Sequence, residues 1–475
     1  MSAPRRILVV GGGVTAWSAA AALKRRVPML DIAILAAPIP DNALADRIAS
    51  TLPSILDFHD DLGIGIEDAV LRTGSAYRLG TQFRGWSGDG SDYLHCYGPH
   101  GQAMGSAPFH LLWARAAAEG SVAPFHTFSA AAAMAAAGRF MLPQGEGLLA
   151  DHGFGLVLDL PRYAAMLAAF CRHVGVRIER GQFAAVVPAA EGGIAAVTRD
   201  DGSALAADLY LDCTGPAARL HAALGAPRED WRRWLPCDRL SLSTAMPADL
   251  SAVETVDAEA TGWRWESALQ SGRVFVNTGG EQDGAVVIDA GATLEPWRHN
   301  VIAIGDAAVS IEPLEWANLH LAHSAIDRVI AMLPADAPHP LEQAEYNRQS
   351  IAEARRARDF VLLHYVTSQR EGAFWQDVAS TAPPESLAHT LRLFRERGRL
   401  PFYEEETFDR DSWLAVLFGQ GVRPRRIDPL AQAVPLAEAA QAIDTYRARL
   451  AQAIAPLPTP AAFRAAQLRQ LHERA

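Results

Sequence analysis

The first 35 residues constrain the fold more than any other segment, because they join apolar runs through a glycine turn and a helix-forming stretch. Residues 5–10 are largely apolar and lead directly into three glycines at 11–13. Helix-forming residues follow over 17–24, and a second apolar run occupies 31–35. This order of strand, tight turn, helix and strand predicts a βαβ unit of the dinucleotide-binding type.

The glycine turn has a defined role in such a unit. Gly11 permits the sharp turn, Gly13 lets the backbone approach a pyrophosphate, and Ala16 stands where a third glycine is common. The helix that begins near Ala16 directs its positive end at those phosphates. A plain tight turn without a ligand is the alternative interpretation of this segment.

Two later segments also join a strand to a turn of small residues. Residues 208–215 predict a strand that ends at Gly215, and residues 300–308 predict a strand that ends near Asp306. With the opening turn, they resemble the three fingerprints of FAD-dependent enzymes of the aromatic hydroxylase type. The resemblance implies that Asp306 accepts a hydrogen bond from the ribityl chain of FAD and that Gly215 allows close approach of the cofactor. The alternative role for Asp306 is to cap a helix that begins at Ala307.

One element of a dinucleotide site is missing from the sequence. An acidic residue normally ends the second strand and binds the adenosine ribose. Ala36 and Ala37 occupy those positions here, and a methyl group accepts no hydrogen bond. The sequence therefore predicts a weakened adenosine half of the site.

Composition and charge exclude several other classes of protein. The 475 residues are 49% hydrophobic and 20% charged, as in an ordinary globular protein. The net charge of -11 leaves no basic excess for nucleic-acid phosphates. The four cysteines form no CxxC pair, and His320 and His323 have no third ligand nearby in sequence, so we expect neither a disulfide framework nor a metal site. No apolar run reaches the roughly 18 residues of a membrane helix, and we predict a cytoplasmic protein.

The remaining elements are predicted from composition and periodicity. Helices are expected over residues 129–138, 159–175 and 438–449, and the chain after residue 340 is expected to be mainly helical. Strands are expected over residues 176–179, 204–213, 272–278, 285–289 and 299–304.

Further landmarks resemble one enzyme family along nearly the whole chain. In order, they resemble the signature segments of flavin-dependent tryptophan halogenases. The segments are residues 77–86, 93–98, 262–265, 311–315, 358–365, 374–375 and 412–421. In that family reduced FAD and oxygen generate hypohalous acid, which passes through a tunnel to a lysine beside the aromatic substrate, with a glutamate nearby. The resemblance implies FAD as cofactor, an aromatic substrate and a separate flavin reductase as partner, and it leaves a homodimer open.

The chain departs from the family in the segments that carry the halogen chemistry. Arg78 replaces the lysine, and the only lysine, Lys24, lies in the first predicted helix. A guanidinium stays protonated and is a poor nucleophile for forming a haloamine, although it can donate a hydrogen bond to an oxidant or bind a carboxylate. Glu315 matches the family glutamate, but Trp316 and Ala317 replace the Ser-Thr pair associated with halide binding. We predict that Arg78 and Glu315 are the catalytic residues; a salt bridge of Arg78 with an acid such as Glu315 is the alternative.

Four aromatic residues are predicted to bind the substrate. His95 and Tyr97 stand where the family stacks its aromatic substrate, with ordinary packing as the alternative. Trp263 and Trp265 share one face of a predicted strand, where they suit the core equally well. The segment that links the flavin and substrate sites in the family, usually Gly-Val-Gly-Glu, aligns with residues 46–49 and differs at each position.

We therefore expect an α/β fold with an FAD-binding Rossmann-like domain of the aromatic hydroxylase type. It is interleaved with a substrate sheet over residues 1–335 and followed by a mainly helical region over 336–475. The first functional hypothesis is a flavin-dependent monooxygenase/halogenase-like oxidoreductase that oxygenates an aromatic or indole-like substrate instead of halogenating it. The alternatives are a catalytically altered flavin- or aromatic-binding protein and a halogenase that works without the lysine.

Overall fold

The structure, a computed structural model, describes residues 5–120, 122–243, 251–277, 279, 284–334 and 338–474. Its internal contacts divide the chain into two units that interleave along the sequence. The first unit is made of Met1–Ser75, Leu158–Ser241 and Val276–Arg355, and the second of Ala76–Val157, Leu242–Phe275 and Arg356–Ala475. The predicted α/β class is confirmed, and the proposed division near residue 335 stays a prediction.

A largely parallel sheet is the centre of the first unit, as the opening βαβ pattern predicts. Its strands, in spatial order, are β18 (Trp297–Arg298), β19 (Val301–Ala303), β10 (Leu209–Asp212), β1 (Arg6–Val10), β2 (Asp31–Ala36), β7 (Arg177–Pro188), β8 (Ile194–Arg199) and β9 (Ala204–Leu205). The five strands from β19 to β7 run parallel, and the outer pairs β18–β19, β7–β8 and β8–β9 are antiparallel. Because parallel strands end on the same side, the segments after β1, β10 and β19 meet at one edge of the sheet.

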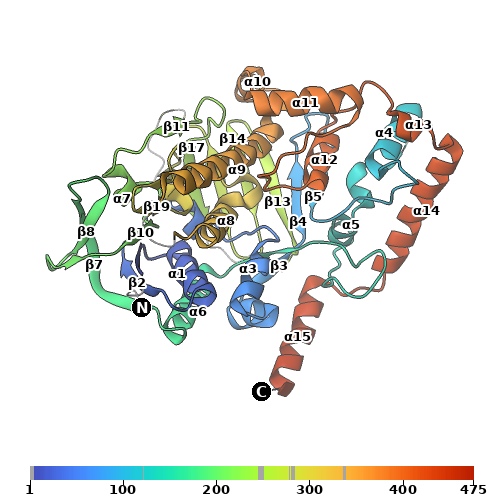
Figure 1. Cartoon of the computed structure of the whole chain (residues 1–475). Helices are drawn as coiled ribbons and strands as arrows, with labels where there is room; N and C mark the ends of the chain where they lie inside the picture. Colours follow the sequence, from blue (N-terminus) through green and yellow to red (C-terminus); the bar gives the residue numbers. More distant parts are fainter. Residues whose placement is uncertain are drawn as a thin grey trace. The chain divides into compact units, whose positions relative to one another are not determined.

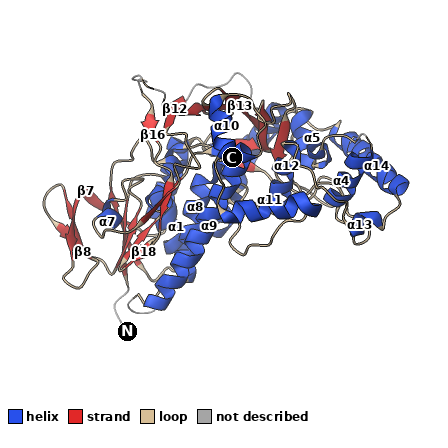
Figure 2. Ribbon diagram, turned by 90° about the horizontal axis from the view of Figure 1, so that it is seen from above, coloured by secondary structure: helices blue, strands red, loops and turns tan. Residues whose placement is uncertain are grey.

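Both faces of this sheet are covered, which explains why its central strands are apolar throughout. Helix α1 (Val14–Arg26) packs on β1 and β2, and it also contacts α6 (Leu160–His173) and α8 (Ala317–Ala331). On the other face, Leu8 and Leu35 belong to a core that includes Phe183 and Val197 of the β7–β8 hairpin. In Figures 1 and 2 this hairpin extends away from the other strands of its sheet.

Shorter elements complete the first unit. They include an antiparallel group of three strands in the order β11 (Arg228–Asp230), β17 (Gly291–Thr293) and β20 (Val309–Ser310), and the pair β12 (Arg239–Ser243) and β16 (Val286–Val287). The short helices are α2 (Leu44–Arg47), α3 (Ile55–Leu62) and α7 (Arg219–Ala222), with single turns at Asp68–Arg72, Gly305–Ala307 and Leu314–Trp316.

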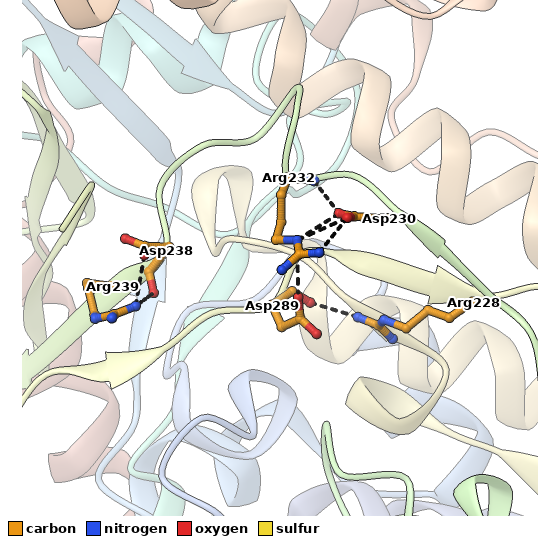
Figure 3. A network of polar contacts seen from close by, with 6 residues as sticks. All are labelled: Arg228, Asp230, Arg232, Asp238, Arg239 and Asp289. Carbon is orange, nitrogen blue, oxygen red and sulfur yellow. Dashed lines mark hydrogen bonds and ion pairs between the residues drawn. The ribbon is translucent and has the colours of Figure 1, made fainter. Parts of the chain in front are cut away.

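Acid–arginine contacts surround β11 and the segments beside it (Figure 3). Arg232 pairs with Asp230 at 2.6 Å, and both side chains are more than half exposed. The guanidinium of Arg228 donates to the carbonyl oxygen of Asp289 at 2.7 Å. Exposed pairs of this kind contribute roughly 0–1 kcal/mol each, and we assign these contacts no functional role.

A second sheet and a group of helices form the second unit. The sheet has the strand order β15 (Ser271–Phe275), β14 (Gly262–Glu266), β13 (Val253–Glu259), β4 (Gly80–Arg84) and β5 (Tyr93–Cys96). A separate antiparallel pair joins β3 (Ala76–Arg78) to β6 (Gly155–Val157). The helices are α4 (Phe109–Glu119), α5 (Ala130–Ala136), α10 (Ala373–Ser380), α11 (Glu385–Arg397), α12 (Arg410–Gly419), α13 (Pro429–Gln432), α14 (Leu436–Ile454) and α15 (Pro460–Arg474), with a single turn at Phe125–Phe128. Helix α9 (Pro340–Val366) passes from the first unit into the second.

Most predicted elements are present, with two differences. The strand predicted over residues 204–213 is wrong in its middle, because the chain changes partner there: β9 pairs with β8, and β10 pairs with β1. Asp208 lies at this break and accepts the backbone N–H of Arg6 at 2.8 Å. The strand predicted over residues 272–278 ends at Phe275, and Thr278 lies outside the described residues. Within the described part of the chain, no helix is long and apolar enough to cross a membrane.

Candidate functional site

The glycine turn after β1 packs so closely that small residues are required. A Cβ atom on Gly11 would lie 2.6 Å from the carbonyl oxygen of Cys213. The same Cβ atom would lie 3.0 Å from the methyl group of Ala16, which is fully buried. Gly11 and Ala16 therefore bring the turn, the first helix and the end of β10 together, as a dinucleotide-binding turn requires.

Gly13 ends the turn and occupies the N-cap position of α1, where it has no side chain to accept a hydrogen bond from the helix. In place of a capping side chain, the carboxylate of Asp46 lies against this helix terminus. Asp46 Oδ1 accepts the backbone N–H of Thr15 at 2.7 Å, and a Cβ atom on Gly13 would lie 2.3 Å from the same oxygen. Burial raises the pKa of Asp46, and the hydrogen bond from Thr15 opposes that rise.

Asp306 lies in the turn after β19 and is 3% exposed. Its Oδ2 atom accepts the backbone N–H of Ala45 at 2.7 Å, while Oδ1 has no hydrogen-bond partner among the described residues. Burial raises the pKa of Asp306 to about 8, with the nearby Asp46 adding to the rise and the Ala45 N–H opposing it. The alternative role as N-cap before Ala307 is wrong, because Asp306 lies inside a single helical turn, and its carboxylate instead accepts the N–H of Ala45 in the first turn of α2.

Gly215 follows β10 and has a left-handed backbone, with φ 79°. A Cβ atom there would lie 3.1 Å from Pro40 and 3.2 Å from Ala43. The loop that contains α2 thus contacts the segment after each of three neighbouring strands: Asp46 reaches the turn after β1, Ala43 lies at Gly215, and Ala45 bonds to Asp306.

The donor set of this edge suits a dinucleotide in part. Asp306 Oδ1 is buried and has no hydrogen-bond partner in the described chain, so it can accept a hydrogen bond from a hydroxyl group of a ligand, whereas the Thr15 side chain is bonded to Asp46. The strand end at Ala36 carries no acid, as predicted from the sequence. The small residues and the buried oxygen at this edge are of the kind that FAD needs, but Asp46 occupies the terminus of α1, and the cofactor-binding roles of Gly11, Gly13, Ala16, Gly215 and Asp306 stay predictions.

The raised pKa of Asp306 predicts a pH-dependent effect of replacing it. An unfolded aspartate has a pKa of about 3.9, so between that value and about 8 the folded chain binds more protons than the unfolded chain. Stability then falls as pH rises through this window, by on the order of 5 kcal/mol at most. We expect Asp306→Asn to raise the melting temperature of the cofactor-free protein, and to raise it more at pH 8 than at pH 5. If the melting temperature rose equally at both pH values, or if the exposed Asp41→Asn showed the same pattern, the raised pKa of Asp306 would be contradicted.

Glu315 and Trp316 form a strained turn before α8. Both have left-handed backbones, with φ 67° and 63°, and both are 1% exposed. Each such conformation costs on the order of 1–3 kcal/mol and persists where the surroundings fix it. Here Pro313 accepts the N–H of Trp316 at 3.1 Å, and the Asn318 side chain donates to Ile311 at 2.9 Å. Glu315 is therefore held rigidly, and its catalytic role stays a prediction.

Arg78 lies at the end of β3 in the second unit and is 1% exposed. Its Nε atom donates to Glu254 Oε2 at 2.7 Å, and its Nη2 atom donates to Thr81 Oγ1 at 2.7 Å. Its Nη1 atom donates to the hydroxyl oxygen of Tyr97. Burial lowers the pKa of Arg78, but Glu254 and Tyr97 more than offset this and raise it, so the guanidinium stays charged.

The strand register explains how these side chains meet. Glu254 on β13 lies beside Thr81 on β4, and Thr81 lies opposite His95 on β5. Directly paired residues of adjacent strands project to the same face. The rings of His95 and Tyr97 are buried and lie 5.7 Å apart, so the structure brings Arg78, His95 and Tyr97 into one cluster. Their roles toward a substrate stay predictions.

Trp263 and Trp265 lie on the buried face of β14, with ring centroids 5.5 Å apart. Trp263 Nε1 donates to the hydroxyl of Tyr365 at 3.0 Å. This contact is one that a core residue makes, and a substrate role for either tryptophan stays a prediction. The two predicted non-ligand histidines are also engaged, His320 with Ser54 and His323 with Ser18.

Sequence reasoning missed Glu254 and gave Asp46 no individual role. Glu254 lies 176 residues from Arg78, and no motif connects them. A signal was present in the alternation of residues 252, 254 and 256, of which 254 and 256 lie on the buried side of β13, because an acid on such a face requires a partner. Asp212 is different: its two oxygens accept the backbone N–H groups of Thr214, Leu220 and His221, so it is structural.

Comparison with known proteins identifies the family. A sequence model of the family described as tryptophan halogenase matches residues 6–286 and 277–436. The chain belongs to the tryptophan halogenase family. Among solved structures, it is 31% identical to BrvH, a flavin-dependent halogenase from Brevundimonas sp. BAL3, with a TM-score of 0.91 over 98% of this chain and 99% of that one. It is also 31% identical to Xcc4156, a flavin-dependent halogenase from Xanthomonas campestris, with a TM-score of 0.89 over 97% of each chain.

A curated relative extends the same likeness. The tryptophan 6-halogenase SttH of Streptomyces toxytricini is 24% identical over 91% of this chain and 93% of its own length. The structural match to these relatives confirms the predicted Rossmann-type fold of the chain. The solved relatives are flavin-dependent halogenases. The family assignment and the prediction of a flavin cofactor are therefore confirmed at the level of the family.

Proposed function

We propose that this chain uses reduced FAD and oxygen to oxidise an aromatic or indole-like substrate, and that it transfers oxygen instead of halogen. Residues Gly11, Gly13, Ala16, Gly215 and Asp306 would hold the cofactor. Reduced FAD, supplied by a separate flavin reductase, provides the electrons that activate oxygen. The flavin dependence of the related halogenases supports the cofactor and the reductase.

The buried pair of Arg78 and Glu254 carries the proposal. A haloamine forms on a neutral amine, whereas the guanidinium is charged and bonded to Glu254 at 2.7 Å. The carboxylate also occupies the side of the guanidinium on which a substrate carboxylate would bind, which argues against Arg78 as a carboxylate clamp. Transfer of oxygen requires no neutral amine at this position.

The contacts give Arg78 a positioning role within the aromatic cluster. By donating to the hydroxyl oxygen of Tyr97, Arg78 directs the hydroxyl proton of Tyr97 away from the guanidinium. The ring of Tyr97 is thereby fixed beside His95, in an edge-to-face arrangement with an interplanar angle of 73°. We propose that these two rings bind the aromatic substrate and that Arg78 orders them.

Halogenation is the second candidate, and one observation favours it. Backbone N–H groups at the beginning of a helix bind anions whatever the side chains are, and α8 begins directly after the strained pair Glu315 and Trp316 with no side-chain cap. These N–H groups belong to the backbone, so they are still able to bind a halide after Trp316 and Ala317 replace the Ser-Thr pair. The names of the related proteins agree with this candidate.

Isotope labelling separates the candidates. The protein, FAD, a flavin reductase and a panel of indoles and phenols are incubated under labelled dioxygen with and without bromide, and products are analysed by mass spectrometry. We expect a product that gains one labelled oxygen atom and does not depend on bromide. Brominated product would support halogenation instead. Flavin binding with no product from any compound would support the binding-protein alternative, and catalase in all reactions removes the contribution of free peroxide.

A further inference from the structure

Asp46 occupies the place at the N-terminus of α1 where an anion binds. Its carboxylate is buried, 9% exposed, and accepts the N–H of Thr15 at 2.7 Å. The absence of a side chain on Gly13 makes room for it, because a Cβ atom there would lie within 2.3 Å of the carboxylate. The 13-residue helix has no acidic residue in its own first turn. Asp46 therefore supplies the negative charge that this terminus favours.

A second observation indicates that this terminus is a ligand site and not only a cap. Asp306 Oδ1, on the same edge of the sheet, is buried and has no hydrogen-bond partner in the described chain. Unsatisfied buried oxygens are uncommon in folded proteins and indicate a missing partner. Thr15 and Asp306 both bond to the segment that contains α2, Thr15 to Asp46 and Asp306 to the backbone of Ala45.

We propose that the carboxylate of Asp46 is an internal substitute for the diphosphate of the flavin. In the cofactor-free chain it holds the terminus of α1, and the diphosphate displaces it on binding. Both groups are anions that need the same N–H donors, so they exclude each other there. The apparent affinity for FAD is consequently the intrinsic affinity multiplied by the fraction of molecules in which Asp46 has left the terminus.

This exchange suits an enzyme whose reduced flavin comes from a separate reductase. Such an enzyme takes up reduced flavin and releases oxidised flavin in each turnover, and a carboxylate that replaces the diphosphate favours release. The inference rests on the proposed function only in that flavin is the cofactor. It holds whether oxygen or halogen is transferred.

Flavin titration of Asp46 variants tests the proposal. We expect Asp46→Ala to bind FAD about tenfold more tightly than the unaltered protein, as measured by calorimetry or flavin fluorescence. Asp46→Asn keeps an oxygen that accepts the Thr15 N–H but loses the charge, so its affinity is expected to lie between the two. Asp41→Asn is the matched control, since Asp41 lies in the same loop with its side chain 81% exposed, and its affinity should change less than about twofold.

Three results would overturn the proposal. The first is unchanged FAD affinity in both Asp46 variants, and the second is an equal gain for Asp41→Asn, which would indicate a general charge effect. The third is failure of folded Asp46→Ala to bind either FAD or inorganic pyrophosphate, with folding checked by circular dichroism. Tighter binding by the Asp46 variants without product from any substrate would support the proposal and count against the proposed function alone.

Discussion

Replacing Glu254 by leucine is expected to destabilise the second unit strongly. The change leaves the guanidinium of Arg78 charged, buried and without its carboxylate, and both side chains of the pair are at most 2% exposed. Removing one partner of a buried ion pair costs roughly 3–5 kcal/mol, because the remaining charge is neither solvated nor compensated. A loss of this size lowers the melting temperature on the order of 10 °C, which differential scanning calorimetry measures directly.

Two further variants make this expectation specific. Removing both charges in Arg78→Met with Glu254→Leu should recover most of the loss, since apolar side chains of similar volume replace buried pairs at little cost. Glu396→Gln is the matched surface control in the same unit. It breaks the pair with Arg426, whose side chain is 74% exposed, and should change stability by about 0–1 kcal/mol. If the melting temperature of Glu254→Leu is no lower than that of this control, the pair of Arg78 and Glu254 does not stabilise the second unit.

The sequence predicted the first unit well because its signals are local. The turn at Gly11 and Gly13, the helix after it and the strands that end near Gly215 and Asp306 are each encoded in short segments. Parallel pairing of those strands then places their ends together, so the cofactor residues converge without further information. The lack of an acidic residue at the end of β2, where Ala36 stands, is likewise visible in a short segment of the sequence.

The contact of Arg78 with Glu254 and the contact of Asp46 with Thr15 join residues that are far apart in the sequence, and neither contact is predicted from the sequence. The alternative to a catalytic role for Arg78 is a salt bridge with an acid such as Glu315; the second unit does pair Arg78 with an acid, but that acid is Glu254. Glu254 reaches Arg78 only through the pairing of β13 with β4. Asp46 reaches the terminus of α1 from a loop that the sequence marked only as altered. Loop position and strand register across long separations are set by packing, and one sequence does not reveal them.

The same pair of residues predicts how a lysine would behave in place of Arg78. In Arg78→Lys alone, Glu254 would hold the new amine as an ammonium ion, because a nearby opposite charge favours the charged form. Adding Glu254→Gln removes that charge, and burial then lowers the pKa of the lysine toward the neutral amine. The resemblance to tryptophan halogenases assigns the halogen-carrying role to a lysine at this position, so we expect the double variant to brominate more than Arg78→Lys alone.

The measurement is the yield of brominated indole with FAD, reductase, oxygen and bromide. The double variant Arg78→Lys with Glu254→Gln is expected to exceed Arg78→Lys alone by about tenfold or more, which corresponds to a drop of at least one unit in the pKa of the lysine. Raising the pH should narrow the gap, because the single variant then also loses its proton. Arg78→Met with Glu254→Gln has no amine and serves as the control. If that control or the unaltered protein brominates as well as the double variant, a neutral amine at position 78 is not required, and the case for oxygen transfer that rests on Arg78 fails.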